Sequence, residues 1–191
     1  MLNFLPKQCK RWLFIFVVII AIVVVLVKVI DLPNIILKKI YPQKYSEYVY
    51  RYSEQSDVDP LLVFAVIKAE SNFDEVVVSS SGAIGLMQLM EKTALEQAGK
   101  HNKNYEYKDL YNPEINIELG TAYLAELINK YNGNYYLAVT AYNAGIGVVD
   151  GWIANGTINP DGSDIENIPY KETNNYVRKI VKNYKMYKEL Y

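Results

Sequence analysis

The 191-residue chain is long enough for one compact domain with an appended segment. Residues 1–40 carry six Lys or Arg and one acidic residue, whereas residues 41–191 carry 14 Lys or Arg and 20 Asp or Glu, a net charge of −6. This acidic balance excludes the basic surface of a nucleic-acid-binding protein, and the single cysteine, Cys9, excludes a disulfide framework.

The first predicted element is an apolar run over residues 12–30, interrupted by one charge at Lys28. As a helix rising 1.5 Å per residue, this run nearly spans a hydrocarbon core of about 30 Å. Three basic residues lie just before it: Lys7, Lys10 and Arg11. Because such residues stay on the cytoplasmic side, residues 1–11 are predicted to be cytoplasmic and the chain after the run extracytoplasmic.

A cleaved signal peptide is the alternative interpretation, because a basic start and an apolar middle are also present there. Residues 28–33, at the end of the run, lack the small residues of a cleavage site. We therefore expect an uncleaved, single-pass signal anchor in the cell membrane. Residues 31–44 are predicted to be a tether, with breaks at Pro33 and Pro42.

Residues 45–191 are predicted to form one mainly α domain of six or seven helices, with loops over 71–85 and 155–167. A short hairpin is expected around residues 76–78. The helix that starts at Pro60 is apolar on most sides and is expected to be central and buried. Helices are expected to start at about Tyr45, at Pro60 with Asp59 as the N-cap, and at Pro113 after Asn112. Further helices are expected over about 93–98, 135–143 and 148–154, and from Pro169 to about 188.

Glu70 is the first candidate for chemistry, because it lies at the C-terminal end of the apolar helix that starts at Pro60. The negative end of the helix dipole and weakly polar surroundings both penalise the ionised form and raise the pKa of a carboxyl group. A carboxylic acid that is still protonated near neutral pH can donate a proton to a leaving oxygen. Taken alone, a solvated helix-end glutamate is the simpler interpretation.

The segment Gly82-Ala83-Ile84-Gly85-Leu86-Met87-Gln88 is the second candidate. Two glycines three residues apart allow tight turns or close approach to a ligand. Gln88 offers a donor and an acceptor for an acetamido group, and Met87 offers an adaptable apolar contact. The alternative is a turn followed by a helix that buries Leu86 and Met87.

Two further segments carry polar groups at expected helix ends. In Ala141-Tyr142-Asn143-Ala144-Gly145, Tyr142 can place its hydroxyl in a site while Asn143 caps the turn. Glu172 falls in the first turn of the last helix, where a carboxylate is stabilised. Each of these also fits an ordinary helix terminus.

Together the four segments resemble the catalytic domain of the soluble lytic transglycosylases, the SLT domain, which has a fold like that of goose-type lysozyme. The resemblance covers about residues 45–191. It implies a lysozyme-like helical domain, so the whole chain is expected to be mainly α, with the one transmembrane helix predicted over residues 12–30 preceding that domain. The matching motifs, in order, are Glu70-Ser71, Gly82-x-x-Gly85-Leu86-Met87-Gln88, Ala141-Tyr142-Asn143-Ala144-Gly145 and Glu172-Thr173-x-x-Tyr176-Val177.

The resemblance implies that Glu70 is the catalytic acid/base. Ser79 matches the loop that contacts an N-acetyl group, although Ser80 and Ser81 adjoin it and leave the exact serine open. Glu172 matches a second acidic residue that lines the cleft and positions substrate. With Met87 and Asn143 from the same motifs, the predicted substrate-binding residues are Ser79, Met87, Gln88, Tyr142, Asn143 and Glu172.

The implied reaction uses one carboxyl group twice. Glu70 protonates the oxygen between N-acetylmuramic acid and N-acetylglucosamine, and the substrate's acetamido group stabilises the charge at C1. The ionised Glu70 then accepts the proton of the C6 hydroxyl, which closes a 1,6-anhydro ring. No metal or other cofactor is expected, and the lone His101 is expected at the surface.

Two alternatives remain open. One is a muramidase that hydrolyses the same bond and uses Asp74 or Glu75 to activate water. The other is a non-catalytic peptidoglycan-binding scaffold protein. The expected partners are peptidoglycan glycan strands, the membrane through the N-terminal helix, and proteins of the cell-wall or secretion machinery.

Overall fold

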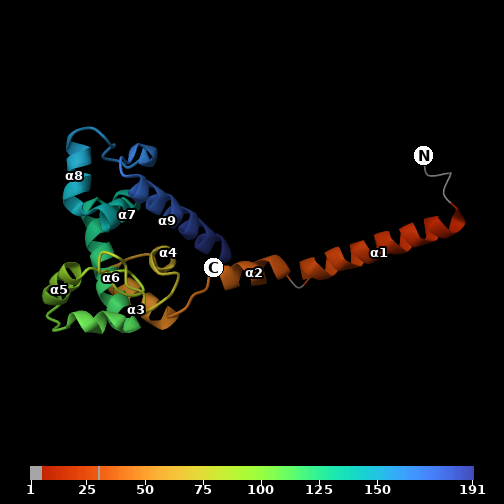
Figure 1. Cartoon of the computed structure of the whole chain (residues 1–191), viewed down its shortest axis with the longest axis horizontal. Coiled ribbons are helices and arrows are strands. Elements are labelled where there is room, and N and C mark those ends of the chain that lie inside the picture. Colours follow the sequence, from red (N-terminus) through yellow and green to blue (C-terminus); the bar gives the residue numbers. More distant parts are fainter. Residues whose placement is uncertain (1–5, 30) are drawn as a thin grey trace. The chain divides into compact units, whose positions relative to one another are not determined.

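The computed structural model describes residues 6–29 and 31–191 (Figure 1). Residues 1–5 of the predicted cytoplasmic N-terminus and residue 30, the predicted end of the membrane segment, lie outside the described residues. The chain divides into two units, one that ends at Pro42 and a globular one that begins at Gln43.

The N-terminal unit consists of two helices, α1 (Lys7–Val29) and α2 (Leu32–Ile40). The 23 residues of α1 span roughly 35 Å, and none of its described apolar side chains is buried in a core. By length and composition, α1 can cross a membrane. Most of the predicted tether, residues 31–44, is helical, because α2 runs past the break expected at Pro33. Pro33 lies in the first turn of α2, where a missing N–H breaks no helical hydrogen bond.

The globular unit is built from helices, as predicted. An extra 3-10 helix at Tyr107–Tyr111 was not predicted, and a second one, Ile165–Asn167, lies in the predicted loop before the last helix. The α-helices of the globular unit are α3 (Ser46–Ser56), α4 (Pro60–Glu70), α5 (Glu91–Lys100), α6 (Pro113–Lys130), α7 (Tyr135–Ala144), α8 (Ile146–Ala154) and α9 (Lys171–Leu190).

Side-chain caps fix three of the helix starts. Asp59 accepts a 2.8 Å hydrogen bond from the Leu61 N–H, which confirms the predicted N-cap, and Asn112 accepts one of 2.9 Å from the Glu114 N–H at the predicted start of α6. Asn134 caps α7 in the same way, at the start of the helix predicted over residues 135–143. These short polar caps set where each helix enters the core.

α4 and α6 lie at the centre of the hydrophobic core. α4 is buried from Leu62 to Ile67, which confirms that it is the central helix. α6 packs against α3, α5 and α7 (Figure 1). The loop between α4 and α5 returns over α6, with isolated bridges from Ile84 to Val78 and Leu89 in place of a regular hairpin.

Gly120 allows this loop to lie directly on α6. A Cβ atom at residue 120 would stand 2.8 Å from Cβ of Met87, closer than side chains tolerate. Met87 is fully buried at this contact. The loop and α6 therefore share a tightly packed contact that only glycine permits.

We expect Gly120→Ala to lower the free energy of unfolding by about 1–3 kcal/mol, because the added methyl group overpacks the Met87 contact. Chemical unfolding of the full chain in detergent measures this change. Gly151→Ala is the matched control, since a Cβ there meets nothing within 4 Å and the replacement in α8 should stabilise by up to about 1 kcal/mol. Equal effects of the two variants would contradict the assigned role of Gly120.

Candidate active site

Glu70 is the last residue of α4, and its carboxyl group meets a residue from the far end of the chain. The hydroxyl of Tyr176, in α9, donates a 2.6 Å hydrogen bond to Oε1 of Glu70. α4 ends at this point because Ser71, the C-cap, leaves the helical conformation. Its hydroxyl donates to the carbonyl of Leu86 at 2.9 Å, which ties the helix end to the following loop.

Burial controls the protonation of Glu70. The pKa of this carboxyl group is raised from 4.5 to about 7, and desolvation by burial is the largest cause. The Tyr176 hydrogen bond and the charge of Lys179 lower the pKa, but by less than burial raises it. Lys179 is held in place because its Nζ donates a 2.5 Å hydrogen bond to the carbonyl of Ala69. The predicted rise in the pKa of Glu70 is confirmed, and the group can both donate and accept a proton near neutral pH.

Tyr142 of α7 bonds the loop between α4 and α5 and senses the charge of Glu70. Its hydroxyl donates a 2.8 Å hydrogen bond to the carbonyl of Met87. Burial raises the pKa of Tyr142 well above its ordinary value, and the charges of Glu70 and Tyr123 raise it further. Tyr142 is therefore a neutral donor in the electric field of Glu70, and its hydroxyl is already engaged by the protein.

Asn116 of α6 fixes the same loop from inside the core. Its side-chain oxygen accepts a 2.8 Å hydrogen bond from the Met87 N–H, and its amide nitrogen donates at 2.9 Å to the carbonyls of Ile84 and Leu110. The side chain is completely buried. Gly85 has φ +78°, and a Cβ there would lie 2.7 Å from the carbonyl oxygen of Leu110, so this turn requires glycine.

A groove of about 240 Å³ lies beside Tyr142. It brings together three of the predicted substrate-binding residues, Gln88, Tyr142 and Asn143. Glu70 does not line this groove, but its charge raises the pKa of Tyr142, which does. The lining residues are Gln88, Leu89, Met90, Thr93, Tyr123, Tyr142, Asn143, Ala144 and Gly145.

Gln88 has only part of its hydrogen-bonding capacity left for a ligand. Its Nε2 donates to the carbonyls of Val77 at 3.1 Å and Gly85 at 3.0 Å. Within residues 6–29 and 31–191, no protein donor bonds its amide oxygen. The sequence suggested a donor and an acceptor at Gln88, whereas the structure leaves mainly the acceptor.

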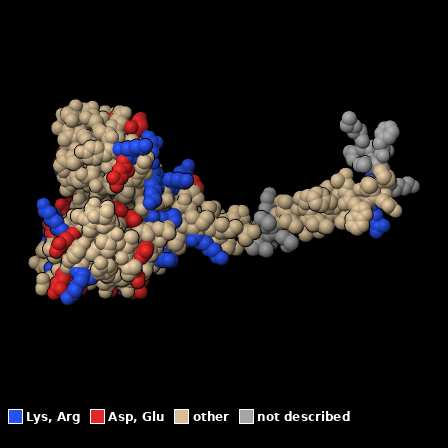
Figure 2. Space-filling model, in the orientation of Figure 1, with Lys and Arg blue, Asp and Glu red and all other residues tan. Residues whose placement is uncertain are grey.

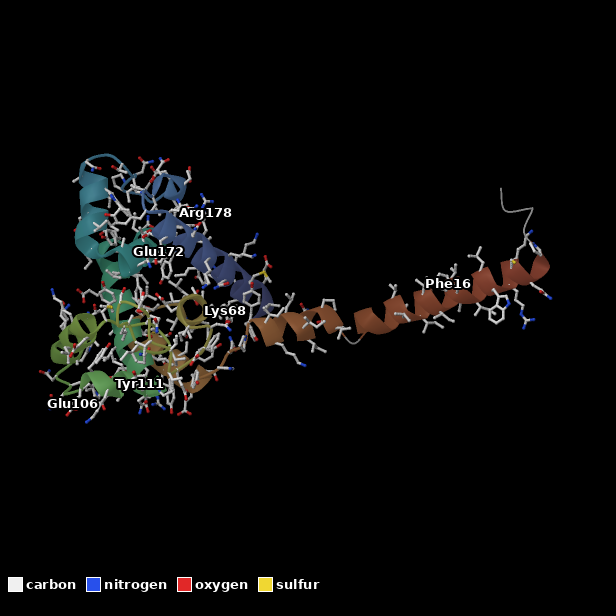
Figure 3. All side chains as sticks on the ribbon, viewed as in Figure 1. Phe16, Lys68, Glu106, Tyr111, Glu172 and Arg178 are labelled. Atoms are coloured by element: carbon white, nitrogen blue, oxygen red, sulfur yellow. The ribbon has the colours of Figure 1, made fainter. Side chains whose placement is uncertain are left out.

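Asn143 joins the groove to the start of α9. Its side-chain oxygen accepts a 2.8 Å hydrogen bond from the hydroxyl of Thr173. Glu172, one residue earlier, lies exposed in the first turn of α9 (Figure 3). The motif around Glu172 is thus anchored to the motif around Tyr142, although the two lie 30 residues apart.

Two predicted contact residues have structural roles in the free protein. The expectation that Met87 offers its side chain to substrate is wrong here, because that side chain is completely buried and packs on α6. The alternative that Met87 and Leu86 enter the core is the correct one. Ser79 closes a turn, since its hydroxyl accepts a 3.0 Å hydrogen bond from the N–H of Ala83.

The acidic residues proposed as alternative bases are engaged locally. Glu75 accepts a 2.5 Å hydrogen bond from the hydroxyl of Tyr45, and Asp74 accepts one of 3.1 Å from the N–H of Val76. Neither is among the groups that shift the pKa of Glu70. In the described part of the chain, no cluster of three or more His, Cys, Asp or Glu side chains is arranged to hold a metal ion.

Sequence reasoning did not assign roles to Tyr176, Lys179 or Asn116. Tyr176 lies one helical turn after Glu172 inside a recognised motif, and Lys179 follows at i+3 on the same face, so their spacing carried a usable signal. Asn116 is a polar residue among buried apolar residues of α6, which also indicates a specific partner.

Comparison with known proteins identifies the domain. Residues 47–162 match the family model described as the transglycosylase SLT domain. The chain is 34% identical over 149 residues to the soluble lytic murein transglycosylase of Salmonella typhimurium, covering 76% of this chain and 23% of that protein. It is 40% identical over 131 residues to the membrane-bound lytic murein transglycosylase C of Edwardsiella ictaluri, covering 61% and 35%.

A solved structure agrees with the sequence match. An inactive mutant of the lytic transglycosylase Slt from Pseudomonas aeruginosa aligns with a TM-score of 0.72 and 32% identity, over 80% of this chain and 25% of that one. The predicted SLT-type, lysozyme-like fold is thus confirmed. The chain spans about a quarter to a third of the length of these relatives.

We expect Tyr176→Phe to make Glu70 titrate about one pH unit higher, because the lost hydrogen bond stabilises the ionised carboxylate. Carboxyl-carbon NMR of the full chain across a pH series measures this. Tyr131→Phe is the matched control, since Tyr131 makes the same kind of bond to Asp150. A Glu70 pKa that is unchanged or lower in Tyr176→Phe would contradict the interpretation.

Proposed function

The chain belongs to the transglycosylase SLT family, and on that premise we propose that it is a membrane-anchored peptidoglycan lytic transglycosylase. Its substrate is the β-1,4 bond between N-acetylmuramic acid and N-acetylglucosamine, and its products carry 1,6-anhydromuramoyl ends. The relatives named above are lytic murein transglycosylases, which supports this reaction for the shared domain.

The observation that carries the proposal is the state of Glu70. Its carboxyl group is largely removed from water, has a pKa of about 7 and receives the hydroxyl proton of Tyr176 in a hydrogen bond. The groups that shift its pKa are a tyrosine and a lysine, so no carboxylate is identified as its catalytic partner within the described residues. A single acid/base suits a reaction that consumes no water.

In the first step, protonated Glu70 donates its proton to the bridging oxygen, and the bond from C1 of the muramic residue to that oxygen breaks. The N-acetylglucosamine side leaves with a hydroxyl group. The positive charge at C1 is stabilised by the acetamido oxygen of the same muramic residue. Tyr176 and Lys179 favour the carboxylate that forms on Glu70.

In the second step, the Glu70 carboxylate accepts the proton of the C6 hydroxyl. The C6 oxygen attacks C1 and closes the anhydro ring, which restores protonated Glu70. A pKa near neutrality serves both steps, because the group must be protonated for the first transfer and ionised for the second. The side-chain oxygen of Gln88 and the Asn143–Thr173 pair are suited to position the acetamido and hydroxyl groups of the sugar.

The proposed anchoring rests on α1 and on the basic residues before it. We infer that α1 spans the cell membrane once, with the N-terminus in the cytoplasm and the SLT domain outside it. This places the domain at the inner edge of the wall, where its substrate is. Wall-synthesis or secretion proteins are the proposed protein partners.

We expect Glu70→Gln to reduce glycan cleavage at least about 100-fold while the domain stays folded, because the amide cannot transfer a proton. Zymography and muropeptide release from purified peptidoglycan measure this. Glu75→Gln is the matched control and should retain activity, because Glu75 bonds Tyr45 rather than Glu70. Full activity of Glu70→Gln would leave the domain with a different catalyst or a binding role.

Mass spectrometry of the products separates the proposed reaction from hydrolysis. Non-hydrolytic cleavage yields anhydromuramoyl ends. These are lighter than hydrolysed ends by one water molecule, about 18 mass units. Reducing muramic ends would instead identify a muramidase. Loss of those ends in Glu75→Gln would then assign the base.

We expect a protease added to wall-stripped cells to digest the domain that begins at Gln43, because that domain lies outside the membrane in the proposed orientation. Immunoblotting with a tag at each end measures which parts survive. A cytoplasmic marker protein controls for cell lysis. Protection of the C-terminal tag in wall-stripped cells that remain unlysed would reverse the orientation.

A further inference from the structure

A second cavity, of about 320 Å³, lies in the globular unit between the first turn of α7 and the last turns of α9. None of its lining residues lines the groove beside Tyr142. Its volume lies in the range of sites for small ligands. The lining residues are Tyr135, Tyr136, Val181, Tyr184, Lys185, Lys188 and Glu189.

Three tyrosine rings form the walls of this cavity. Tyr135 and Tyr136 stack with ring centroids 4.2 Å apart, and Tyr184 meets Tyr135 edge-on at 5.5 Å. The hydroxyl of Tyr184 donates a 2.5 Å hydrogen bond to Asp59, which fixes that ring. Rings held in this way present flat apolar surfaces with polar edges, which suit the C–H faces and hydroxyl groups of a sugar.

Cationic groups also line the cavity, and one of them lies over a tyrosine ring. Nζ of Lys188 lies 4.8 Å from the ring centroid of Tyr184, and Lys185 is 4.0 Å from Glu189, its carboxylate partner. The two ammonium groups outnumber the single carboxylate of the lining. Exposed ion pairs of this kind are weak, so Lys185 can exchange Glu189 for another anion at little cost.

The cavity belongs to a basic region of an acidic domain. α9 carries six Lys or Arg and two Glu, whereas residues 41–191 have a net charge of −6. Figure 2 shows Lys and Arg side chains gathered over α9. The local potential at the cavity therefore favours an anionic group, in contrast to the domain as a whole.

We propose that this cavity binds a sugar residue that carries a carboxylate, as a second contact with the glycan strand. The proposal rests on the proposed function, which supplies the substrate class. Tyr136 and Tyr184 contact the sugar ring, while Lys185 and Lys188 bind the carboxylate. That carboxylate belongs either to the lactyl group of muramic acid or to the peptide attached to it.

The test uses the full chain in detergent micelles, with Glu70→Gln present so that the strand stays intact. Isothermal titration measures the affinity for three soluble probes: neutral N-acetylglucosamine oligomers, glycan strands stripped of peptide, and strands that keep their peptides. Lys185→Gln/Lys188→Gln should weaken binding of an acidic strand about tenfold, the loss of one good charged contact. Tyr136→Ala should weaken binding of the acidic strands to a similar extent.

Lys182→Gln is the matched control, because Lys182 is an exposed lysine of α9 outside the cavity. Its affinities should stay within twofold of those of the Glu70→Gln parent. If Lys185→Gln/Lys188→Gln weakens binding of the peptide-free strands, the lysines bind the lactyl carboxylate. If it weakens binding only of the peptide-bearing strands, they bind a carboxylate of the peptide. Equal losses in the cavity variant and Lys182→Gln would overturn the proposal.

Two further outcomes keep the proposal separate from the proposed function. If a glycerol-phosphate polymer binds with the same lysine dependence and no loss in Tyr136→Ala, the cavity recognises charge alone and the sugar assignment fails. If the unmodified chain cleaves no glycan but the cavity variants still lose acidic-strand binding, the proposed reaction fails and the cavity assignment stands.

Discussion

The buried amide of Asn116 is the interaction on which the site depends. One side chain bonds three backbone groups, the N–H of Met87 and the carbonyls of Ile84 and Leu110, in a part of the core closed to water. It therefore sets the path of the loop after α4 over α6. Once that path is set, the carbonyl of Met87 stands where Tyr142 can donate to it, and Gln88 reaches the groove. The groove is thus a consequence of a polar contact in the core.

Glu70 is governed by a balance between burial and two stabilising neighbours. Burial alone would favour a carboxyl group that stays protonated, and Tyr176 and Lys179 bring its pKa back toward neutrality. Both neighbours come from α9, 106 and 109 residues further along the chain. The packing of α9 on the end of α4 therefore sets the acidity of the site, so the pKa of Glu70 depends on tertiary structure that no local segment encodes.

Much of the fold was predictable, because its signals are local. Asp59 before Pro60 and Asn112 before Pro113 marked helix starts, and the apolar character of residues 61–67 marked the central helix. The catalytic candidate was predictable from motif order, and its raised pKa from its apolar helix.

The rest depended on which faces meet in three dimensions. Met87 was predicted to contact substrate because it adjoins Gln88 in the motif. The sequence does not reveal whether its apolar side chain points toward the groove or into the core. Only the close approach to Gly120 decides that its side chain enters the core. Likewise, the two prolines of residues 31–44 predicted breaks. A proline in the first turn is compatible with a helix, however, and Pro33 lies in the first turn of α2.

α9 gives the proposed enzyme a rigid connection between its two sites. Tyr176, at Glu70, and Tyr184, at the second cavity, are eight residues apart on one helix, which corresponds to roughly 12 Å along the axis. The partners of these tyrosines, Glu70 and Asp59, flank the two ends of α4, so α4 and α9 brace each other at both positions. A strand held at the cavity would be confined near Glu70, which raises its effective concentration at the catalytic acid without any new contact there. The same helix that tunes the acid therefore has the geometry to retain the polymer on which the acid acts.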